Sequence, residues 1–114
     1  MDPHRRLTVL QAAQYVADEI NQLIDDRPGQ LIHVAQLRKS SQSIAGNIAE
    51  GFDRRTIGER HHSLGVARGE AGETIIHLRP NFVTGRIDAR TFWRLYNRLM
   101  VIRKMLSSHM NRGD

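Results

Sequence analysis

The chain has 114 residues, a formal net charge of +5 at pH 7 and no cysteine. A chain of this length forms one domain around a single core, so we expect one domain over residues 1–114. Without cysteine it can form neither a disulfide framework nor a thiolate metal site. The first residues are interrupted by acids, which argues against a signal peptide or a membrane span. We therefore expect a soluble cytoplasmic protein with no membrane contact.

Apolar residues recur every three or four positions in four segments, a spacing that is typical of amphipathic helices. The expected buried faces are Val9, Ala13, Val16, Ile20 and Leu23; Val34, Leu37, Ser41, Ile44 and Ile48; Leu64, Ala67, Ala71, Ile75 and Leu78; and Phe92, Leu95, Leu99, Ile102 and Leu106. Short connections join the segments, so the sequence predicts an all-α, up-down-up-down four-helix bundle.

Residues that start or stop helices mark the boundaries of these segments. Pro28 is expected to close the first helix, and Gly51 to end the second in a left-handed conformation. The run Thr56–Glu59 fits a capping box at the start of the third helix. Pro80 lacks a backbone donor and disfavours helix at Arg79, so we expect the third helix to stop or kink there and residues 81–86 to form a connection. Asp88 is the expected cap of the fourth.

Three residues near the end of the second helix are assigned structural roles. Asn47 flanks the buried face, so its amide should bond to a neighbouring helix or to the turn around Gly51 rather than to a ligand. Glu50 and Gly51 are likewise expected to have structural roles.

The order of residues from Leu37 to Glu73 resembles the bacterial four-helix-bundle proteins encoded in intervening sequences of large-subunit ribosomal RNA genes. The matching positions are Leu37, Arg38, Ser43, Ile44, Asn47, Ile48, Ala49, Glu50, Gly51, Arg54, Leu64, Ala67, Gly69 and Glu73. Two residues depart from the pattern: Ala45 replaces a usual proline and Glu70 a usual serine. The resemblance implies a cytoplasmic homopentamer with no established enzymatic activity. A related fold is the accessory variability determinant of diversity-generating retroelements, a basic pentamer that works with reverse transcriptase and RNA.

Four glycines fall on one strip of the third predicted helix: Gly58, Gly65, Gly69 and Gly72. Each glycine costs a helix about 1 kcal/mol relative to alanine. We therefore expect a compensating close approach by a helix from the same chain or from a neighbouring subunit. Weak selection on helix propensity is the alternative.

A second apolar strip lies beside the core face of the fourth predicted helix: Trp93, Tyr96 and Met100. Exposed apolar strips of this kind commonly mark interfaces. Together with the glycines, this strip predicts a homo-oligomer, and the family resemblance favours a pentamer. The alternative is a broad edge of the core.

Basic residues gather in the last third of the chain, where Asp88 is the only acid between Arg79 and Arg112. Arg90, Arg94 and Arg98 recur on one helical strip away from the core face, with Lys104 towards the same side. Arginine binds phosphate through paired hydrogen bonds, so this stripe predicts contact with RNA or DNA.

A second basic patch is expected around the turn between the second and third helices: Arg38, Lys39, Arg54, Arg55 and Arg60. Either patch could instead be an ordinary solvated face. The partners we consider are RNA, DNA or a nucleic-acid enzyme, and the competing hypothesis is a protein-binding scaffold without affinity for nucleic acid.

An enzymatic role is a further alternative, because ferritin-like bundles hold two metals with paired Glu-x-x-His motifs. Glu59 and His62 have this spacing, but the sequence supplies no second motif. A lone zinc site using His61, His62 or His77 is a further alternative. We expect no catalytic residue, no metal and no cofactor.

Overall fold

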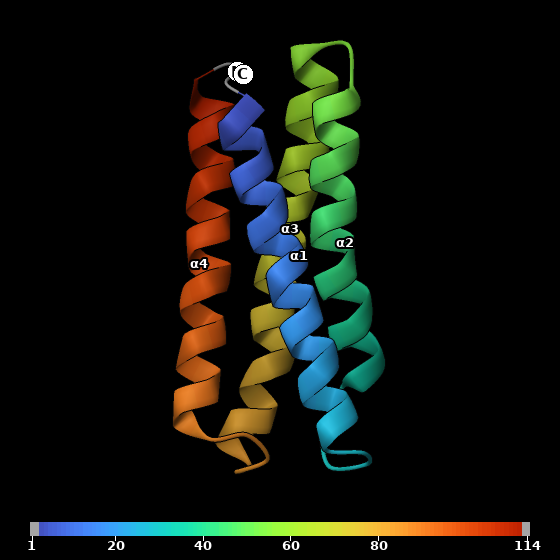
Figure 1. Ribbon diagram of the computed structural model, residues 1–114, viewed down its shortest axis with the longest axis vertical. Coiled ribbons are helices and arrows are strands. Elements are labelled where there is room, and N and C mark those ends of the chain that lie inside the picture. The colour runs from blue at the N-terminus through green and yellow to red at the C-terminus, as the bar shows by residue number, and fades with distance from the viewer. Residues whose placement is uncertain (1–2, 113–114) are drawn as a thin grey trace.

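The computed structural model describes residues 3–112, and four helices account for most of them (Figure 1). They are α1 (Pro3–Asp26), α2 (Val34–Asp53), α3 (Ile57–Val83) and α4 (Ala89–Asn111). Successive helices run in opposite directions along the long axis (Figure 1). The predicted all-α, four-helix fold is confirmed. The outermost residues of the predicted domain, 1–2 and 113–114, lie outside the described residues.

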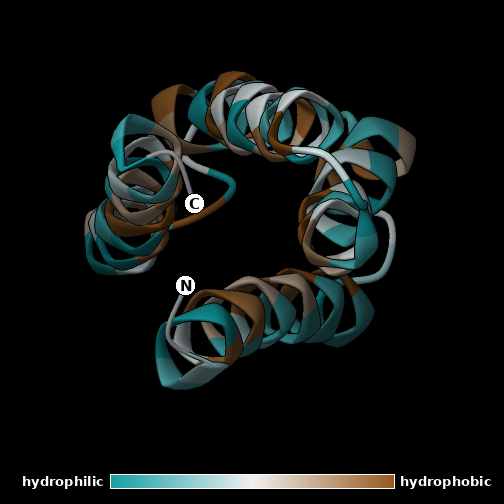
Figure 2. Ribbon diagram, turned by 90° about the horizontal axis from the view of Figure 1, so that it is seen from above, coloured by the Kyte–Doolittle hydropathy of each residue, from teal (hydrophilic) through white to brown (hydrophobic). Residues whose placement is uncertain are grey.

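The helices are arranged as a ring around one apolar column. Each helix packs against two neighbours, because α1 contacts α2 and α4 while α3 contacts α2 and α4. Figure 2 shows the four helices from above, arranged around this column. The molecule measures 43 × 21 × 20 Å, so the core is a narrow column along the long axis.

The core consists largely of the residues that the spacing predicts. All five expected positions of α4 are buried, and in α1 only Leu23 is left partly exposed. Ile24 is buried in its place, since it follows Ile20 by one helical turn. Val34 and Ile75 are also only partly buried, although both pack against the core.

The third helix does not stop before Pro80, which corrects the boundary expected from the sequence. Helix α3 continues through Pro80 to Val83, and the amide of Thr84 still donates to the carbonyl of Pro80 at 3.1 Å. Proline removes one hydrogen bond here, because its nitrogen cannot donate to the carbonyl of Ile76. Asn81, the next residue, ties this end of the helix to Ile32.

Asn81, expected in a connection, is fully buried in α3. Its Oδ1 accepts from the amide of Ile32 at 2.8 Å and its Nδ2 donates to the carbonyl of Ile32 at 2.9 Å. The backbone carbonyl of Asn81 accepts from the amides of Arg86 and Ile87. One residue therefore binds both connections at this end of the bundle.

Helix α2 does not end at Gly51, which is a second correction. The helix continues to Asp53, and the glycines with a positive φ among the described residues are Gly29 and Gly85. Gly51 is buried against α3, and a Cβ added there would lie 3.1 Å from Cβ of Ser63. The glycine is needed for close contact between two helices rather than for a turn.

The remaining local predictions concern caps and the end of α2. The hydroxyl of Thr56 accepts from the amide of Glu59 at 3.1 Å, and Oδ1 of Asp88 accepts from the amide of Thr91 at 2.7 Å, so both N-caps are confirmed. Asn47 does not bond to a neighbouring helix. Its Nδ2 donates to the carbonyl and the hydroxyl of Ser43, one turn earlier in α2.

Candidate nucleic-acid interface

The predicted arginine stripe of α4 is largely part of a contact with α1. Arg94 donates through Nε to Glu19 at 2.7 Å, and Arg98 forms an ion pair with the same carboxylate. The guanidinium of Arg98 also lies over the ring of Tyr15, 4.8 Å from its centroid. The stripe does face away from the core, because Arg90 and Arg94 are exposed and Arg98 is partly buried. Arg94 and Arg98 nevertheless share the carboxylate of Glu19. Arg90 is exposed and has no ion pair among the described residues.

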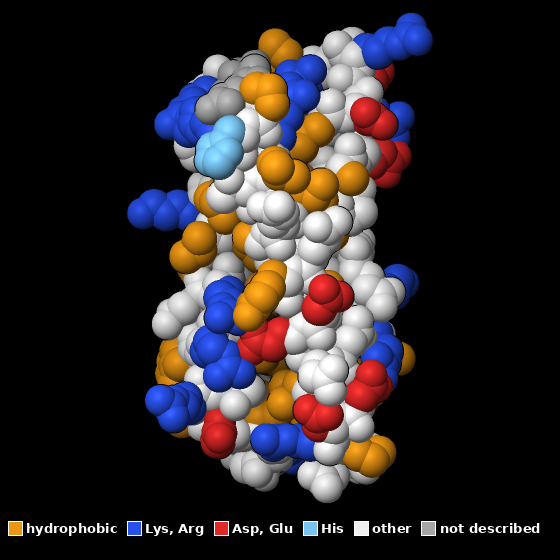
Figure 3. All heavy atoms as spheres, viewed as in Figure 1, with side chains coloured by type: hydrophobic (Ala, Val, Ile, Leu, Met, Phe, Trp, Pro, Cys, Tyr) orange, Lys and Arg blue, Asp and Glu red, His pale blue; other side chains and the backbone are white. Residues whose placement is uncertain are grey.

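This pairing changes the electrostatics of the surface. The Glu19 side chain is only 19% exposed and offsets charge on both arginines. Figure 3 shows acidic and basic side chains intermixed over the lower half of this face. The face is therefore no continuous cationic surface of the kind that binds phosphates strongly.

In the second predicted patch, too, some basic residues have acidic partners and others do not. Arg38 donates to Asn21 at 2.7 Å and to Asp25 at 2.9 Å, while Arg54 pairs with Glu50 one turn earlier. Lys39 and Arg55 are exposed and have no ion pair in the described part of the chain. Lys39 lies 14 residues before Asp53, the end of α2, or about 21 Å along the helix axis, and Arg55 follows in the connection to α3. They do not form one patch around the turn.

A cationic groove that the sequence analysis missed lies between α3 and α4. We call it the α3–α4 groove; it has a volume of about 710 Å³. Its lining residues are Arg68, Asn97, Met100, Val101, Arg103, Lys104 and Ser107. No lining residue is acidic, so the positive charge of Arg68, Arg103 and Lys104 is not offset within the groove. Of these, only Lys104 was predicted.

Contacts between the two helices set the positions of the groove's arginines. Arg68 donates from Nη1 to the hydroxyl of Ser107 at 3.0 Å, which links α3 to α4. Arg103 lies across α3 beside Gly72, where an added Cβ would be 3.9 Å from its guanidinium carbon. The Nε of Arg103 is buried and has no hydrogen-bond partner among the described residues. These two arginines come from different helices, so the spacing within one helix could not reveal the cluster.

The glycine strip of α3 faces outward. A Cβ added at Gly58, Gly65 or Gly69 would meet no atom of the chain within 4 Å, and only Arg103 comes that close to Gly72. The expected approach of a helix from the same chain is therefore wrong. Ile76, on the same outward strip, is 58% exposed.

The apolar strip of α4 is at the surface as well, as part of an aromatic cluster. Trp93 is 50% exposed, Met100 is exposed and Tyr96 is partly buried. Phe92 is buried and stacks on Phe82 with ring centroids 4.5 Å apart, and Trp93 contacts both rings from the outside.

Residues 5–108 match the 23S rRNA-intervening sequence protein family. The chain belongs to this family. A comparison with curated proteins finds no match. Among solved structures, the chain is similar to a crystal structure of a protein of unknown function from the S23 ribosomal protein family of Bacteroides thetaiotaomicron VPI-5482. The two share 24% identity with a TM-score of 0.86, covering 94% of this chain and 98% of the other. This likeness supports the fold, and the family resemblance seen in the sequence is confirmed.

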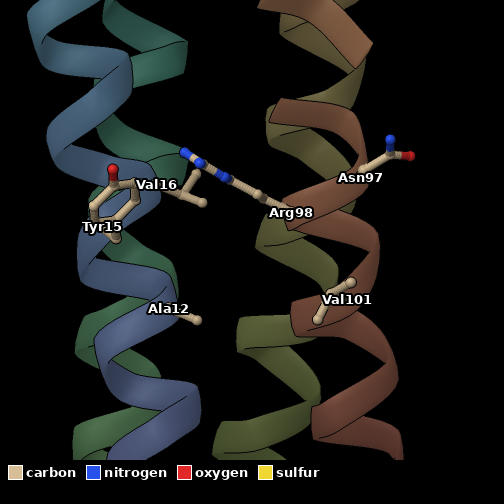
Figure 4. A pocket seen from close by; sticks show the side chains of 6 residues that line it. All are labelled: Ala12, Tyr15, Val16, Asn97, Arg98 and Val101. Carbon is tan, nitrogen blue, oxygen red and sulfur yellow. The ribbon is translucent and has the colours of Figure 1, made fainter. Parts of the chain in front are cut away.

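An apolar pocket opens between α1 and α4 (Figure 4). It shares Asn97 and Val101 of α4 with the α3–α4 groove. Arg98 reaches across it from α4 towards α1, whereas Asn97 is directed away (Figure 4). Tyr15, which lines the pocket, is 60% exposed. The seam between α1 and α4 is thus closed by ion pairs at Glu19 and open beside Tyr15.

Within residues 3–112, no cluster of three or more histidine, aspartate or glutamate side chains could hold a metal ion. His33 and His77 lie with their Nδ1 atoms 3.0 Å apart, and Glu73 lies 3.6 Å from Nε2 of His77. Hydrogen bonds from the side chain and the backbone of Thr91 lower the pKa of Asp88, as expected for an N-cap. No described helix is long and apolar enough to cross a membrane.

Proposed function

We propose that this protein is a non-enzymatic RNA-binding helical bundle that holds phosphates in the α3–α4 groove. The supporting observation is that Arg68, Arg103 and Lys104 line one groove without an acidic neighbour in it. Unpaired cations release condensed counterions when they bind phosphates, and this release supplies most of the affinity for nucleic acid. The proposal assigns no catalytic residue.

The groove is a better candidate for phosphate binding than the α4 stripe, because no acidic side chain lines it. A phosphate that bound Arg94 or Arg98 would compete with the carboxylate of Glu19, which already occupies both side chains. In the groove, Arg68 donates to a neutral hydroxyl, and neither Arg68 nor Arg103 forms an ion pair among the described residues.

RNA is the first nucleic acid to test because the family takes its description from an intervening sequence of 23S rRNA. Phosphate contacts alone do not distinguish sequences. We therefore expect binding with little sequence preference and a strong dependence on salt.

The test compares two double variants that remove the same charge. Arg103→Gln with Lys104→Gln removes two groove cations, whereas Lys39→Gln with Arg55→Gln removes two exposed cations elsewhere. The groove variant should weaken RNA binding and lower the slope of log K against log salt by about 1.4 for a single strand, since each contact contributes about 0.7. The control should bind like the parent.

An equal loss of RNA affinity in the two variants would indicate nonspecific attraction to a basic protein and would contradict the groove assignment. An absence of RNA and DNA binding by the parent would favour the scaffold hypothesis instead. Circular dichroism of both variants checks that helicity is retained.

We also propose that the protein self-associates through the outward face of α3. Four glycines in that helix cost about 1 kcal/mol each, and no atom of the same chain approaches three of them. Ile76 and Val83 are 58% and 68% exposed on this helix. A second copy would bury these side chains and pack closely over the glycines. Light scattering should give a discrete oligomer, with five chains as the favoured number, and Gly69→Leu should lower its mass.

A further inference from the structure

We propose that the α3–α4 groove takes single-stranded RNA, with one base stacked on the indole of Trp93. The inference rests on the proposed RNA binding and specifies the form of RNA. It is carried by the geometry of Trp93 and by its alignment with the groove along α4.

Trp93 is held in a fixed orientation without a stacked neighbour. The rings of Phe82, Phe92 and Tyr96 contact it at interplanar angles of 71°, 77° and 78°. Each of these contacts is nearly perpendicular, so no described ring lies parallel to the indole. Half of the side chain is nevertheless exposed. A rigid, half-exposed indole is a ready platform for a planar base.

The indole and the groove lie on one face of α4. Trp93, Asn97, Met100 and Lys104 follow one another at steps of four, three and four residues, which keeps them on one side of the helix. Trp93 and Lys104 are 11 residues apart, or about 16 Å along the helix axis. That span corresponds to about five nucleotides of a stacked strand at roughly 3.4 Å each.

A strand along this face would meet two kinds of contact. Its phosphates would reach Arg68, Arg103 and Lys104 at one end, and an unpaired base would reach Trp93 at the other. Asn97 is exposed between them and points away from α1, where its amide can bond to a base edge (Figure 4). Combining cations with an aromatic platform is how proteins bind single strands without strong sequence preference.

Double-stranded RNA fits this face less well. Its bases are already paired and stacked, so their faces are closed to a side chain at a helix surface. A duplex would therefore meet the groove cations but not the indole.

Trp93 was also predicted from the sequence to lie in an oligomer interface. The two roles exclude each other, because an indole buried between copies cannot stack on a base. The outward glycine strip of α3 borders Tyr96, Met100 and Arg103. The inference therefore requires that self-association through α3 leaves Trp93 exposed.

Fluorescence provides a direct test because Trp93 is the only tryptophan in the chain. We would titrate the protein with a 12-nucleotide single-stranded RNA and with the corresponding duplex, following binding independently by anisotropy of a labelled RNA. The single strand should quench the fluorescence at saturation and the duplex should not. Equal fluorescence changes with the two ligands would overturn the inference.

Variants separate stacking from folding and assembly. Trp93→Ala should raise the Kd for the single strand by about 5- to 150-fold, the range expected for the loss of one stacked base, and should change duplex binding little. Trp93→Phe keeps an aromatic ring against Phe82 and Tyr96 and should restore part of the affinity. Tyr15→Ala removes an exposed aromatic outside the groove and should bind like the parent.

The outcomes distinguish this inference from the proposed function. If the groove cations matter but Trp93→Ala binds single strands as tightly as the parent, only the stacking is wrong. If the parent binds no RNA, the proposed function and the inference both fail. If Trp93→Ala lowers the molar mass in light scattering, Trp93 belongs to an oligomer interface and the inference is overturned.

Discussion

Two helix–helix contacts of the bundle, which we call the α2–α3 seam and the α1–α4 seam, depend on different interactions. Between α2 and α3, contact is close and the groups are small: Gly51 lies against Ser63, and the Thr74 hydroxyl donates to that of Ser40 at 2.8 Å in the core. Between α1 and α4, contact depends on Glu19 and its two arginine partners, and an apolar pocket stays open beside it. The first seam depends on shape and the second on charge.

This difference predicts how each seam responds to change. Close packing tolerates almost no added volume, whereas partly exposed ion pairs contribute little and respond to salt. The α2–α3 seam should therefore be sensitive to single substitutions, and the α1–α4 seam should be sensitive to solution conditions. The predictions below test this contrast, starting from the largest expected effect.

Gly51→Leu should be the most damaging substitution. A Cβ alone would approach Leu64 Cδ2 to 3.2 Å and the backbone carbonyl of Arg60 to 3.4 Å, so a leucine forces α2 and α3 apart. We expect a loss of at least about 1 to 3 kcal/mol in the free energy of unfolding, measured by urea denaturation. Gly46→Leu, in the same helix with no atom within 4 Å, is the control and should not destabilise. Equal destabilisation would refute the close-packing account.

Asn81→Ala should come next. It leaves the amide and the carbonyl of Ile32 without their side-chain partner, at about 1 to 3 kcal/mol for each buried group that water cannot reach. Asn97→Ala, at an exposed position of α4, is the matched control and should change the melting temperature little. Similar melting temperatures for the two variants would show that the buried amide is not needed.

Glu19→Gln should have a smaller effect that depends on salt. The variant weakens both ion pairs to α4, and partly exposed pairs contribute about 0 to 1 kcal/mol each. The difference from the parent should shrink as salt rises, because ions screen the lost attraction. Asp18→Asn removes a neighbouring acid with no ion pair among the described residues and serves as control. A deficit that persists at high salt would mean that Glu19 acts through packing.

Asp88→Asn should have the smallest effect, visible in its pH dependence. Because the pKa of Asp88 is lowered in the folded state, its contribution is present above the ordinary value of 3.8 and is lost as pH falls through the lower folded value. Asparagine caps helices comparably but does not titrate in this range. The stability difference between parent and variant should therefore change only below about pH 4. A constant difference through that range would contradict the assignment.

Periodicity predicts the core well because burial in a bundle depends on positions along one helix. The predicted faces of α1 and α4 are buried almost without exception. Pro80 shows the limit of local rules: α3 continues past it to Asn81, whose partner Ile32 lies 49 residues away. Local propensity gives no information about such distant contacts.

The candidate site was less predictable for a related reason. Spacing within α4 correctly places Arg94 and Arg98 on one strip, but their partner Glu19 lies on another helix. Whether a cation is free depends on what the neighbouring helix presents, and that requires the rotation of both helices about their axes. Arg68 and Arg103 lie on different helices, and only the packing of α3 against α4 brings them into one groove.

The two connections at one end of the bundle, 27–33 and 84–88, share a set of hydrogen bonds. Asn81 binds Ile32 and Arg86, while Arg27 donates to the carbonyl of Arg86 at 3.0 Å and Arg86 donates to that of Gln30 at 3.1 Å. Because these bonds depend on one another, the end should open as a single cooperative unit. Hydrogen exchange at the amides of Ile32, Arg86 and Ile87 should then give one common free energy of opening. That free energy would report the stability of this closed end independently of the helices that it joins.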